Sequence, residues 1–537
     1  MITGLFLAAA LGLSGAQTAP ASAPAPTAPV TMTLHAEEDG ARVVWRFPQP
    51  QRTLRLAAPL SPMRHAVTLD GAAARIVRGA AGCGPDCRFQ TAGARLSPGS
   101  GPRAVFPMVI EAGECGLWVD LSAVQPIDPV TGANLTLAVT ANGQTLAPAG
   151  TAPDYIAMRA PERGPVCAAT DLIAEDRLSA MLRRSAQDYG RIFGRLEAPP
   201  DLILAEGRFG APGRNGLRGA AVSEDLLIVL AEPGADADRT TLAGLVSHEA
   251  AHIWLGRRAR FHPDFHEPWI IEGAAEYLSL KQLLRTELAG ADVVLDAAAR
   301  HTGACLAALD RRRLRLSGSD EAGPFAYNCG VLIALYADAA AQAAGSSFEA
   351  IAADMVADRA FRAGQATPVD FLRILAAHIG PDAMRALRTN VLEGPDLGKR
   401  NRTLALFSAA GLGEESAAPD ADPVYLAGVA ADRVVSALCP EGAGRWWIDE
   451  GVVIELGPAC RGPEGTSELT SIEGAKLPVE AGRALLAMDR ACAADGTVSF
   501  RLGPEDAAAH CSGLEPDWFR GFAMNRDRML EVLRGAP

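Results

Sequence analysis

The chain has 537 residues, a formal net charge of −13 and 49% hydrophobic residues. This length is too great for one ordinary core and predicts about two to four domains, while the apolar content excludes a largely disordered protein. The chain is acidic, and its densest basic run is one short arginine-rich stretch at 310–318. Because a nucleic-acid-binding protein needs a larger basic surface, this composition excludes nucleic acid as the main partner.

The N-terminus has the pattern of a secretory signal. An apolar run over 5–13 is followed by small residues and a cleavage site near Ala16 or Ala19. The run is too short to span a bilayer, and no later stretch is long enough to do so. We therefore expect a signal peptide over 1–19, a disordered leader over 20–30, and export to the periplasm or the medium without a remaining membrane span.

The ten cysteines all follow this signal, and an even number suits an oxidising compartment. Their order suggests local pairs, although connectivity stays open at this stage. A cysteine metal site would need paired CxxC spacing, which the chain lacks. The suggested pairs are Cys83–Cys87, Cys115–Cys167, Cys305–Cys329, Cys439–Cys460 and Cys492–Cys511.

The pattern of the chain changes twice after the leader. Short alternating runs with Gly, Pro and Asp turns over 31–165 are typical of strands and predict a β-sandwich. Over 166–412 helical spacing dominates. An amphipathic helix over 172–194 comes first, strand-like stretches over 201–207 and 217–230 follow, and nearly everything after 238 is helical. An acidic linker, Gly413–Pro423, precedes a mixed segment over 424–537, in which a strand, a helix and a strand are predicted over 468–474, 479–492 and 496–502. The expected fold is multidomain α+β: a β-rich N-terminal domain, a mostly helical central domain and a small C-terminal α/β domain.

The central segment contains "LVSHEAAHIWLG", Leu245–Gly256. On a helix, His248 and His252 lie one turn apart on the same face, so both imidazoles can reach one metal ion. Glu249 lies beside them, where a carboxylate can take a proton from metal-bound water. Taken alone, the pattern leaves open that both histidines are structural.

A second helix, "EPWIIEGAAEYLSLKQLL", supplies the missing ligand. Glu272 lies 20 positions after His252, which lets one helix end, a loop turn and a second helix pack alongside. A tetrahedral catalytic zinc needs three protein ligands and one open position. Glu276, one turn beyond Glu272, is placed to accept the spare ring N–H of a ligand histidine. One Zn²⁺ per chain is predicted.

These residues resemble the gluzincin metallopeptidases, in which a glutamate ligand follows HExxH. The gap of 19 residues equals that of thermolysin, whereas the W-x-x-E-G-x-x-x-Y context is more similar to aminopeptidase N and the glycyl aminopeptidases. The resemblance implies a thermolysin-like catalytic domain with zinc ligands His248, His252 and Glu272, and Glu249 as general base. Glycyl aminopeptidases also have a β-rich N-terminal domain and often a C-terminal PDZ domain, whose second half residues 468–502 resemble.

The same resemblance implies an oxyanion-stabilising residue. Tyr327, with Gly330 after it, is similar to a tyrosine that performs this role on a later helix of the aminopeptidases. Hydrolysis of a peptide needs a donor aimed at the developing oxyanion, which suits a tyrosine hydroxyl. The alternative is a tyrosine that merely begins a helix.

A glycine-rich stretch, Gly213–Asp225, is similar to the segment that binds substrate in the glycyl aminopeptidases. Gly216, Arg218 and Gly219 are the substrate-binding residues that this resemblance implies, on a strand edge that pairs with extended peptide. Arg218 stands where those enzymes have the glutamate that holds the substrate's amino terminus. Either Glu224 serves instead, or the chain is not an ordinary aminopeptidase.

The other histidines carry weaker signals. His262 and His266 are also four positions apart, but Pro263 between them makes a shared helix face, and hence a second metal site, improbable. Either could instead touch substrate. Five isolated histidines are expected to be structural: His35, His65, His301, His378 and His510.

The sequence therefore predicts an exported zinc metallopeptidase acting on peptides or protein segments, with exo- or endopeptidase action left open. The competing interpretation is a catalytically silent peptide-binding or scaffold protein on a peptidase fold, for which Arg218 is the main support. Oligomeric state and cleavage specificity are not indicated by any pattern in the chain.

Overall fold

The computed structural model describes the chain from residue 29 to residue 535. The predicted signal peptide at 1–19 and most of the leader at 20–30 lie outside the described residues, as do Gly216, Glu224 and His266. The described range has gaps at 38–39, 57–64, 78–79, 83–87, 97–108, 112–115, 121–123, 128–134, 136, 142–143, 147–154, 160–165, 169–174, 197–199, 207–216, 222–225, 232–237, 263–264, 266, 310–322, 394–397, 417–421, 440–443, 449–450, 463 and 512–520.

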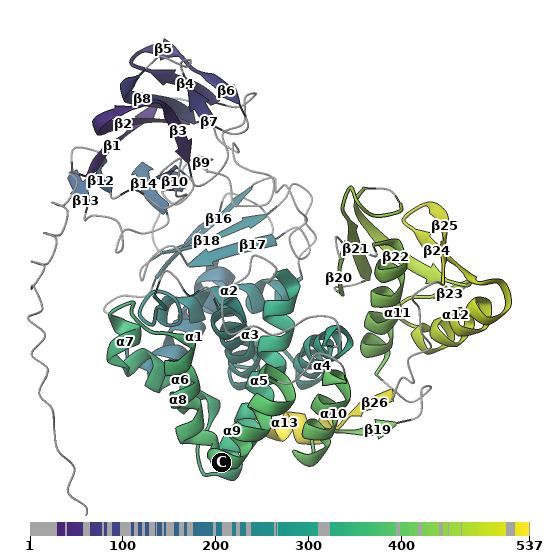
Figure 1. Cartoon of the computed structure of the whole chain (residues 1–537). Helices are drawn as coiled ribbons and strands as arrows, with labels where there is room; N and C mark the ends of the chain where they lie inside the picture. Colours follow the sequence, from purple (N-terminus) through teal and green to yellow (C-terminus); the bar gives the residue numbers. More distant parts are fainter. Residues whose placement is uncertain are drawn as a thin grey trace, which may run out of the picture. The chain divides into compact units, whose positions relative to one another are not determined.

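The chain divides into two compact units. The first takes in the described parts of 1–35, 42–95 and 125–152, and the remainder forms the second. Two sheets make up most of the first unit, with strand orders β13–β12–β1–β2–β8–β4–β5 and β11–β3–β7–β6 (Figure 1). Their bounds are β1 Val30–Glu37, β2 Gly40–Gln51, β3 Thr53–Leu56, β4 His65–Leu69, β5 Ala72–Ala73, β6 Arg75–Val77, β7 Ala80–Gly82, β8 Phe89–Leu96, β11 Pro126–Ile127, β12 Leu137–Ala141 and β13 Gln144–Leu146.

The core of this unit follows from the alternating pattern of its strands. Met32 and Leu34 on β1 are buried while the residues between and beside them are more exposed, as expected for a strand with one face on a core. Phe47 and Phe89 pack edge to face with ring centroids 5.8 Å apart. The predicted β-rich character of this region is confirmed.

The second unit contains two further sheets whose strands precede α2 in the chain. One is ordered β14–β10–β9 and the other β15–β16–β18–β17. In the latter, β15, β16 and β18 are parallel, whereas β17 runs antiparallel to β18 at the edge of the described sheet. The bounds are β9 Val109–Glu111, β10 Leu117–Asp120, β14 Tyr155–Arg159, β15 Val166–Ala168, β16 Asp201–Glu206, β17 Leu217–Ala221 and β18 Leu226–Ala231.

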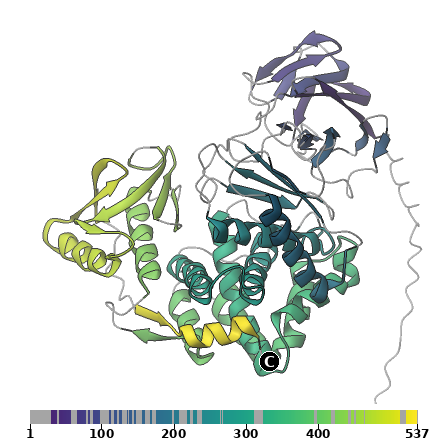
Figure 2. The ribbon, with the colours of Figure 1, turned by 180° about the vertical axis from the view of Figure 1, so that it is seen from behind.

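Helices form most of the rest of this unit (Figures 1 and 2). α2 packs against β17 and β18 and begins at a capping residue, Asp238, whose carboxylate accepts the Thr241 N–H at 2.7 Å. α3 begins at Pro268, where a residue without an N–H suits the first turn. The helices are α1 Glu175–Phe193, α2 Arg239–Trp254, α3 Pro268–Arg285, α4 Ala291–Ala308, α5 Gly323–Ala343, α6 Phe348–Ala357, α7 Arg359–Arg362, α8 Pro368–Ile379, α9 Pro381–Leu387 with a π-helical turn η2 Arg388–Leu392, and α10 Lys399–Ala409.

The C-terminal end of the chain returns to these helices. β19 (Gly413–Ser416) pairs antiparallel with β26 (Gly521–Met524), and α13 (Arg526–Arg534) packs against α3, α4 and α5. The prediction of a linker beginning at Gly413 is therefore wrong for these first four residues, because they find a strand partner far along the chain.

A smaller mixed lobe lies in the sequence between β19 and β26. Its sheet is ordered β20–β21–β22–β24–β25, and β23 pairs with β22. The predicted strand, helix and strand of the C-terminal segment are present as β22, α12 and β24. The bounds are α11 Pro423–Leu438, β20 Gly444–Ile448, β21 Val452–Leu456, β22 Gly465–Ile472, β23 Ala475–Lys476, α12 Ala481–Asp495, β24 Thr497–Leu502 and β25 Glu505–His510.

Three of the five suggested cysteine pairs are confirmed: Cys305–Cys329, Cys439–Cys460 and Cys492–Cys511. Cys167 is also disulfide-bonded, while its suggested partner Cys115 and the Cys83–Cys87 pair lie outside the described residues. Among the described helices, none combines the length and apolarity that crossing a membrane requires.

Candidate metal centre

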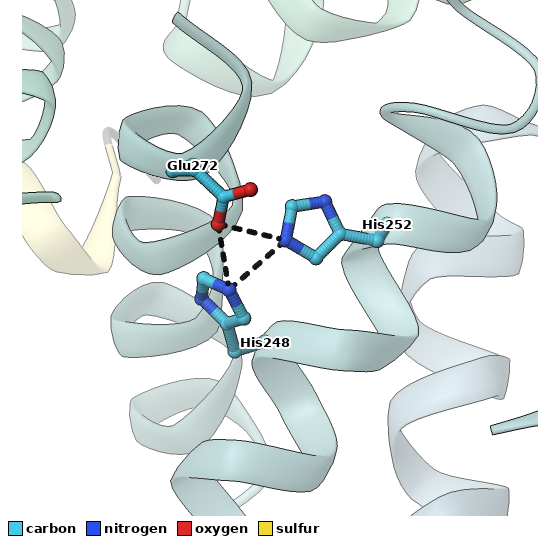
Figure 3. A group of neighbouring side chains, drawn as sticks. All are labelled: His248, His252 and Glu272. Carbon is cyan, nitrogen blue, oxygen red and sulfur yellow. Dashed lines mark hydrogen bonds and ion pairs between the residues drawn. The ribbon is translucent and has the colours of Figure 1, made fainter. Parts of the chain in front are cut away.

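Three side chains from α2 and α3 converge on one point. His248 and His252 project from successive turns of α2, and Glu272 projects towards them from α3 (Figure 3). Within the described part of the chain, they are the group of His, Cys, Asp or Glu side chains that could hold a metal ion. The predicted ligand set is thus brought together by the packing of two neighbouring helices.

The spacing of the three ligand atoms suits zinc. His248 Nε2 lies 3.0 Å from His252 Nε2 and 3.3 Å from Glu272 Oε2, and His252 Nε2 lies 3.2 Å from Glu272 Oε2. Tetrahedral zinc with bonds of about 2.0–2.1 Å would separate its ligands by about 3.3 Å. The triangle therefore has the dimensions of one face of a zinc tetrahedron, with the fourth corner left for water or substrate.

The contacts of the outer ring nitrogens leave the inner ring nitrogens available to a cation. His252 Nδ1 lies 3.1 Å from the Leu255 carbonyl oxygen, and His248 Nδ1 lies 2.8 Å from Glu276 Oε2. Both partners are acceptors, so each favours a proton on Nδ1 and a lone pair on Nε2. Two imidazole lone pairs and a carboxylate oxygen then face one another, an arrangement that suits the binding of a metal ion.

Without a metal, the charges of the cluster shift the pKa values of its histidines and of Glu272. Burial lowers the pKa of the His248 imidazole, but its hydrogen bonds with Glu272 and Glu276 outweigh burial and hold it well above its ordinary value. Burial raises the pKa of Glu272, yet the charge of His252 and the hydrogen bond with His248 hold it well below its ordinary value. Metal binding must therefore displace protons from the histidines.

Glu249 lies beside this cluster, where the sequence predicts the general base. The residue is 6% exposed, and burial raises the pKa of its carboxyl above the ordinary value, although His248 and His252 oppose the shift. The backbone N–H of Ala221 on β17 donates to the carboxylate. A carboxyl whose pKa is shifted towards neutral pH suits the role of a group that accepts a proton and then releases it.

The edge strand β17 sets the place of that carboxylate. A Cβ on Gly219 would lie 2.6 Å from Glu249 Oε1, so only a glycine leaves room for the side chain. The carbonyl of Ala221 accepts the Arg257 Nε–H at 2.8 Å, which fixes the end of the strand. Successive side chains on a strand alternate in direction, so Arg218 projects to the face opposite that on which Gly219 meets Glu249.

Tyr327 lies on the first turns of α5, close to the same cluster. Its ring centroid is 5.7 Å from that of His248, and the residue is 37% exposed. Partial burial raises the pKa of the tyrosine hydroxyl well above its ordinary value, and the negative charges of Glu272 and Glu249 raise it further. The hydroxyl therefore stays protonated and can act as a hydrogen-bond donor.

Two glycines bring Tyr327 to the cluster. Gly330 on α5 faces Gly273 on α3, and a Cβ on either would overlap with the Cα of the other. This contact lets the two helices cross backbone to backbone. Because Gly273 directly follows Glu272, the crossing places the tyrosine turn beside the ligand turn.

His301, which the sequence predicts to be an isolated structural histidine, contacts this cluster. His301 on α4 places Nε2 at 3.0 Å from Glu276 Oε1 and Nδ1 at 2.8 Å from Asn328 Oδ1. The available signal was indirect: Cys305, one turn after His301, pairs with Cys329, which is two residues after Tyr327. His262, in the loop between α2 and α3, has its ring centroid 6.1 Å from that of Phe265 and does not belong to the candidate metal cluster.

Comparison with known proteins gives solved structures alone. No protein-family model and no curated protein sequence matches the chain. Similar structures include an M1 zinc metallopeptidase from Deinococcus radiodurans, with 17% identity over 68% of this chain and 93% of that chain and a TM-score of 0.36. A variant of the same enzyme bound to a Tyr-Ser-Ala substrate has equal identity and TM-score, and covers 68% of this chain and 94% of its own.

Yeast LTA4 hydrolase is also similar, with 13% identity over 76% of this chain and 72% of that chain and a TM-score of 0.42. The Deinococcus enzyme is a zinc metallopeptidase, the class of protein that the sequence resembles. At such low identities and TM-scores, the function of the site is argued from its geometry and not from these similarities.

Proposed function

We propose that the chain is a zinc-dependent metallopeptidase of the gluzincin type, exported through its N-terminal signal, that hydrolyses peptide bonds in peptides or protein segments. The observation that carries the proposal is the meeting of ligand atoms from His248, His252 and Glu272 beside the buried carboxylate of Glu249. An N-terminal β-sandwich, a thermolysin-like catalytic domain and a PDZ-like C-terminal domain belong to the same proposal.

The chemistry divides between the metal and the chain. When bound, zinc supplies a Lewis acid that polarises the scissile carbonyl and acidifies the attacking water. Glu249 takes the proton of that water and then delivers it to the leaving amine, which suits its raised pKa. The Tyr327 hydroxyl donates a hydrogen bond to the oxygen on which negative charge develops.

The substrate would lie along β17. This strand is the edge of the described four-stranded sheet and passes the general base at Gly219. An extended peptide that adds to such an edge is held by backbone hydrogen bonds. A peptide bond held along β17 would lie beside Glu249, and Gly219 has no side chain that would displace the peptide.

Cleavage of a diverse peptide mixture, followed by mass spectrometry with and without a zinc chelator, tests the proposal. Chelator-sensitive products are expected; loss of single N-terminal residues would indicate an aminopeptidase, and internal cuts an endopeptidase. Glu249→Gln is the matched control, expected to keep zinc while losing turnover. Zinc-loaded protein that cleaves nothing would contradict the proposal and favour the competing peptide-binding scaffold.

A further inference from the structure

Glu276 lies between two imidazoles. Its Oε2 is 2.8 Å from His248 Nδ1, and its Oε1 is 3.0 Å from His301 Nε2. His301 is 8% exposed and reaches this carboxylate from α4. A side chain on a third helix therefore contacts the group that supports a metal ligand.

The second ring nitrogen of His301 extends the contact to the tyrosine turn. Nδ1 lies 2.8 Å from the side-chain oxygen of Asn328, which directly follows Tyr327 on α5. The disulfide Cys305–Cys329 fastens the same two helix turns, because Cys305 is one turn after His301 and Cys329 follows Asn328. His301 thus touches both α3 and α5 from a position that is covalently held.

The physical effect of this arrangement falls on His248. The terminal torsion of a glutamate is broad, so a carboxylate held by one partner can rotate. The hydrogen bond from His301 fixes the carboxylate plane. The fixed carboxylate, whose Oε2 lies 2.8 Å from His248 Nδ1, orients the His248 ring so that Nε2 faces the metal position. Loss of the hydrogen bond from His301 would leave the ring of His248 less well oriented.

We propose that His301 is a positioning residue of the zinc centre, which holds Glu276 and through it the ligand His248, and which joins this support to the Tyr327 turn through Asn328. The inference rests on the zinc centre of the proposed function. It concerns metal affinity, so its test does not depend on peptidase activity.

The experiment measures the zinc dissociation constant of the full chain by competition with a chromophoric chelator. His301→Leu removes both contacts. His301→Gln keeps a donor near the position of Nε2, whereas His301→Asn keeps a polar atom near Nδ1 alone. Thr302→Val is the matched control, because Thr302 is the next residue of α4, is fully buried, and bonds only to the Ala298 carbonyl at 2.8 Å among the described contacts.

We expect His301→Leu and His301→Asn to weaken zinc binding about tenfold, the lower end of the range for outer partners of metal ligands. His301→Gln should restore affinity close to that of the wild type, and Thr302→Val should leave it unchanged. Rescue by the glutamine variant is the readout that a merely structural histidine would not give.

Unchanged zinc affinity in His301→Leu, with a loss of thermal stability equal to that of Thr302→Val, would overturn the inference. If His301→Leu does not fold, the glutamine and asparagine variants decide, and equal zinc affinity in those two would overturn it as well. A wild-type chain that binds no zinc would refute the proposed function itself, so the two failures are distinct.

Discussion

The helices α2 and α3 and the edge strand β17 both border the candidate centre, but they contribute in different ways. The helices supply the proposed ligand atoms, on His248, His252 and Glu272, which together could hold a metal ion. The strand supplies a backbone N–H, from Ala221, and the missing side chain of Gly219. Metal binding should therefore depend on the helices, and placement of the general base on the strand.

The largest expected effect is on the helical side. His252→Ala removes one of three ligand atoms, so we expect zinc affinity to fall by several orders of magnitude and activity to be lost with it, because a catalytic zinc needs three protein ligands. Metal content after dialysis and peptidase rate are the measurements. Full activity with bound zinc in this variant would contradict the ligand assignment.

The strand is tested by Gly219→Ala. The new Cβ would displace the Glu249 carboxylate, and a shift of about 1 Å at a catalytic group can cost about 100-fold in rate. We expect kcat to fall by about that factor while zinc affinity stays unchanged. Ala220→Ser, on the opposite face of β17, is the control and should retain activity. Loss of zinc from Gly219→Ala would show that the strand also contributes to metal binding, which would contradict the separate roles of strand and helices.

The crossing of α3 and α5 is tested by Gly330→Ala. The added methyl group would overlap with Gly273 Cα and the Trp269 carbonyl oxygen, both parts of the backbone. Such overpacking should cost about 3 kcal/mol of stability and lower kcat by moving Tyr327. Gly244→Ala on α2 is the control, since its Cβ would meet only a leucine methyl at 3.8 Å. Equal unfolding midpoints for both variants would show that the crossing tolerates a side chain.

The smallest effect concerns Glu267, which precedes α3. The residue is 3% exposed, and its carboxylate accepts the Trp269 Nε1–H at 2.9 Å. Burial raises the pKa of this carboxyl from 4.5 to about 7. The folded state therefore keeps a proton that the unfolded chain releases, so this group's contribution to stability is lost as pH rises from about 4.5 to about 7.

Glu267→Gln should remove that dependence. Relative to the wild type, we expect the variant to gain on the order of 2 kcal/mol between about pH 5 and about pH 8. Urea unfolding at the two pH values measures the difference. A constant difference between variant and wild type would show that Glu267 stays ionised in the folded chain.

The sequence was sufficient where local spacing decides geometry. Residues three or four apart share a helix face, which is why His248, His252 and the pair Glu272 and Glu276 could be assigned together. Helix and strand segments around the site, including α1 and β16, likewise follow from hydrophobic periodicity.

Features that depend on distant segments meeting were not predictable in the same way. The contact of His301 with Glu276, the approach of Gly219 to Glu249 and the crossing at Gly330 each join separate elements. No periodic pattern in one segment encodes its partner in another. The pairing of β19 with β26 was missed for that reason, because a short acidic stretch reads as a linker until its partner strand is known.

The return of α13 to the helical core has a consequence for the support of α3. Lys281 and Gln342 both donate to the Val532 carbonyl, at 3.4 and 2.8 Å, and Lys281 lies on the same helix as Glu272. Removal of residues 521–534 would leave a buried lysine and the flank of the ligand-bearing helix without this cover. Although no proposed ligand belongs to this segment, the support of α3 depends on a carbonyl that lies 251 positions further along the chain than Lys281.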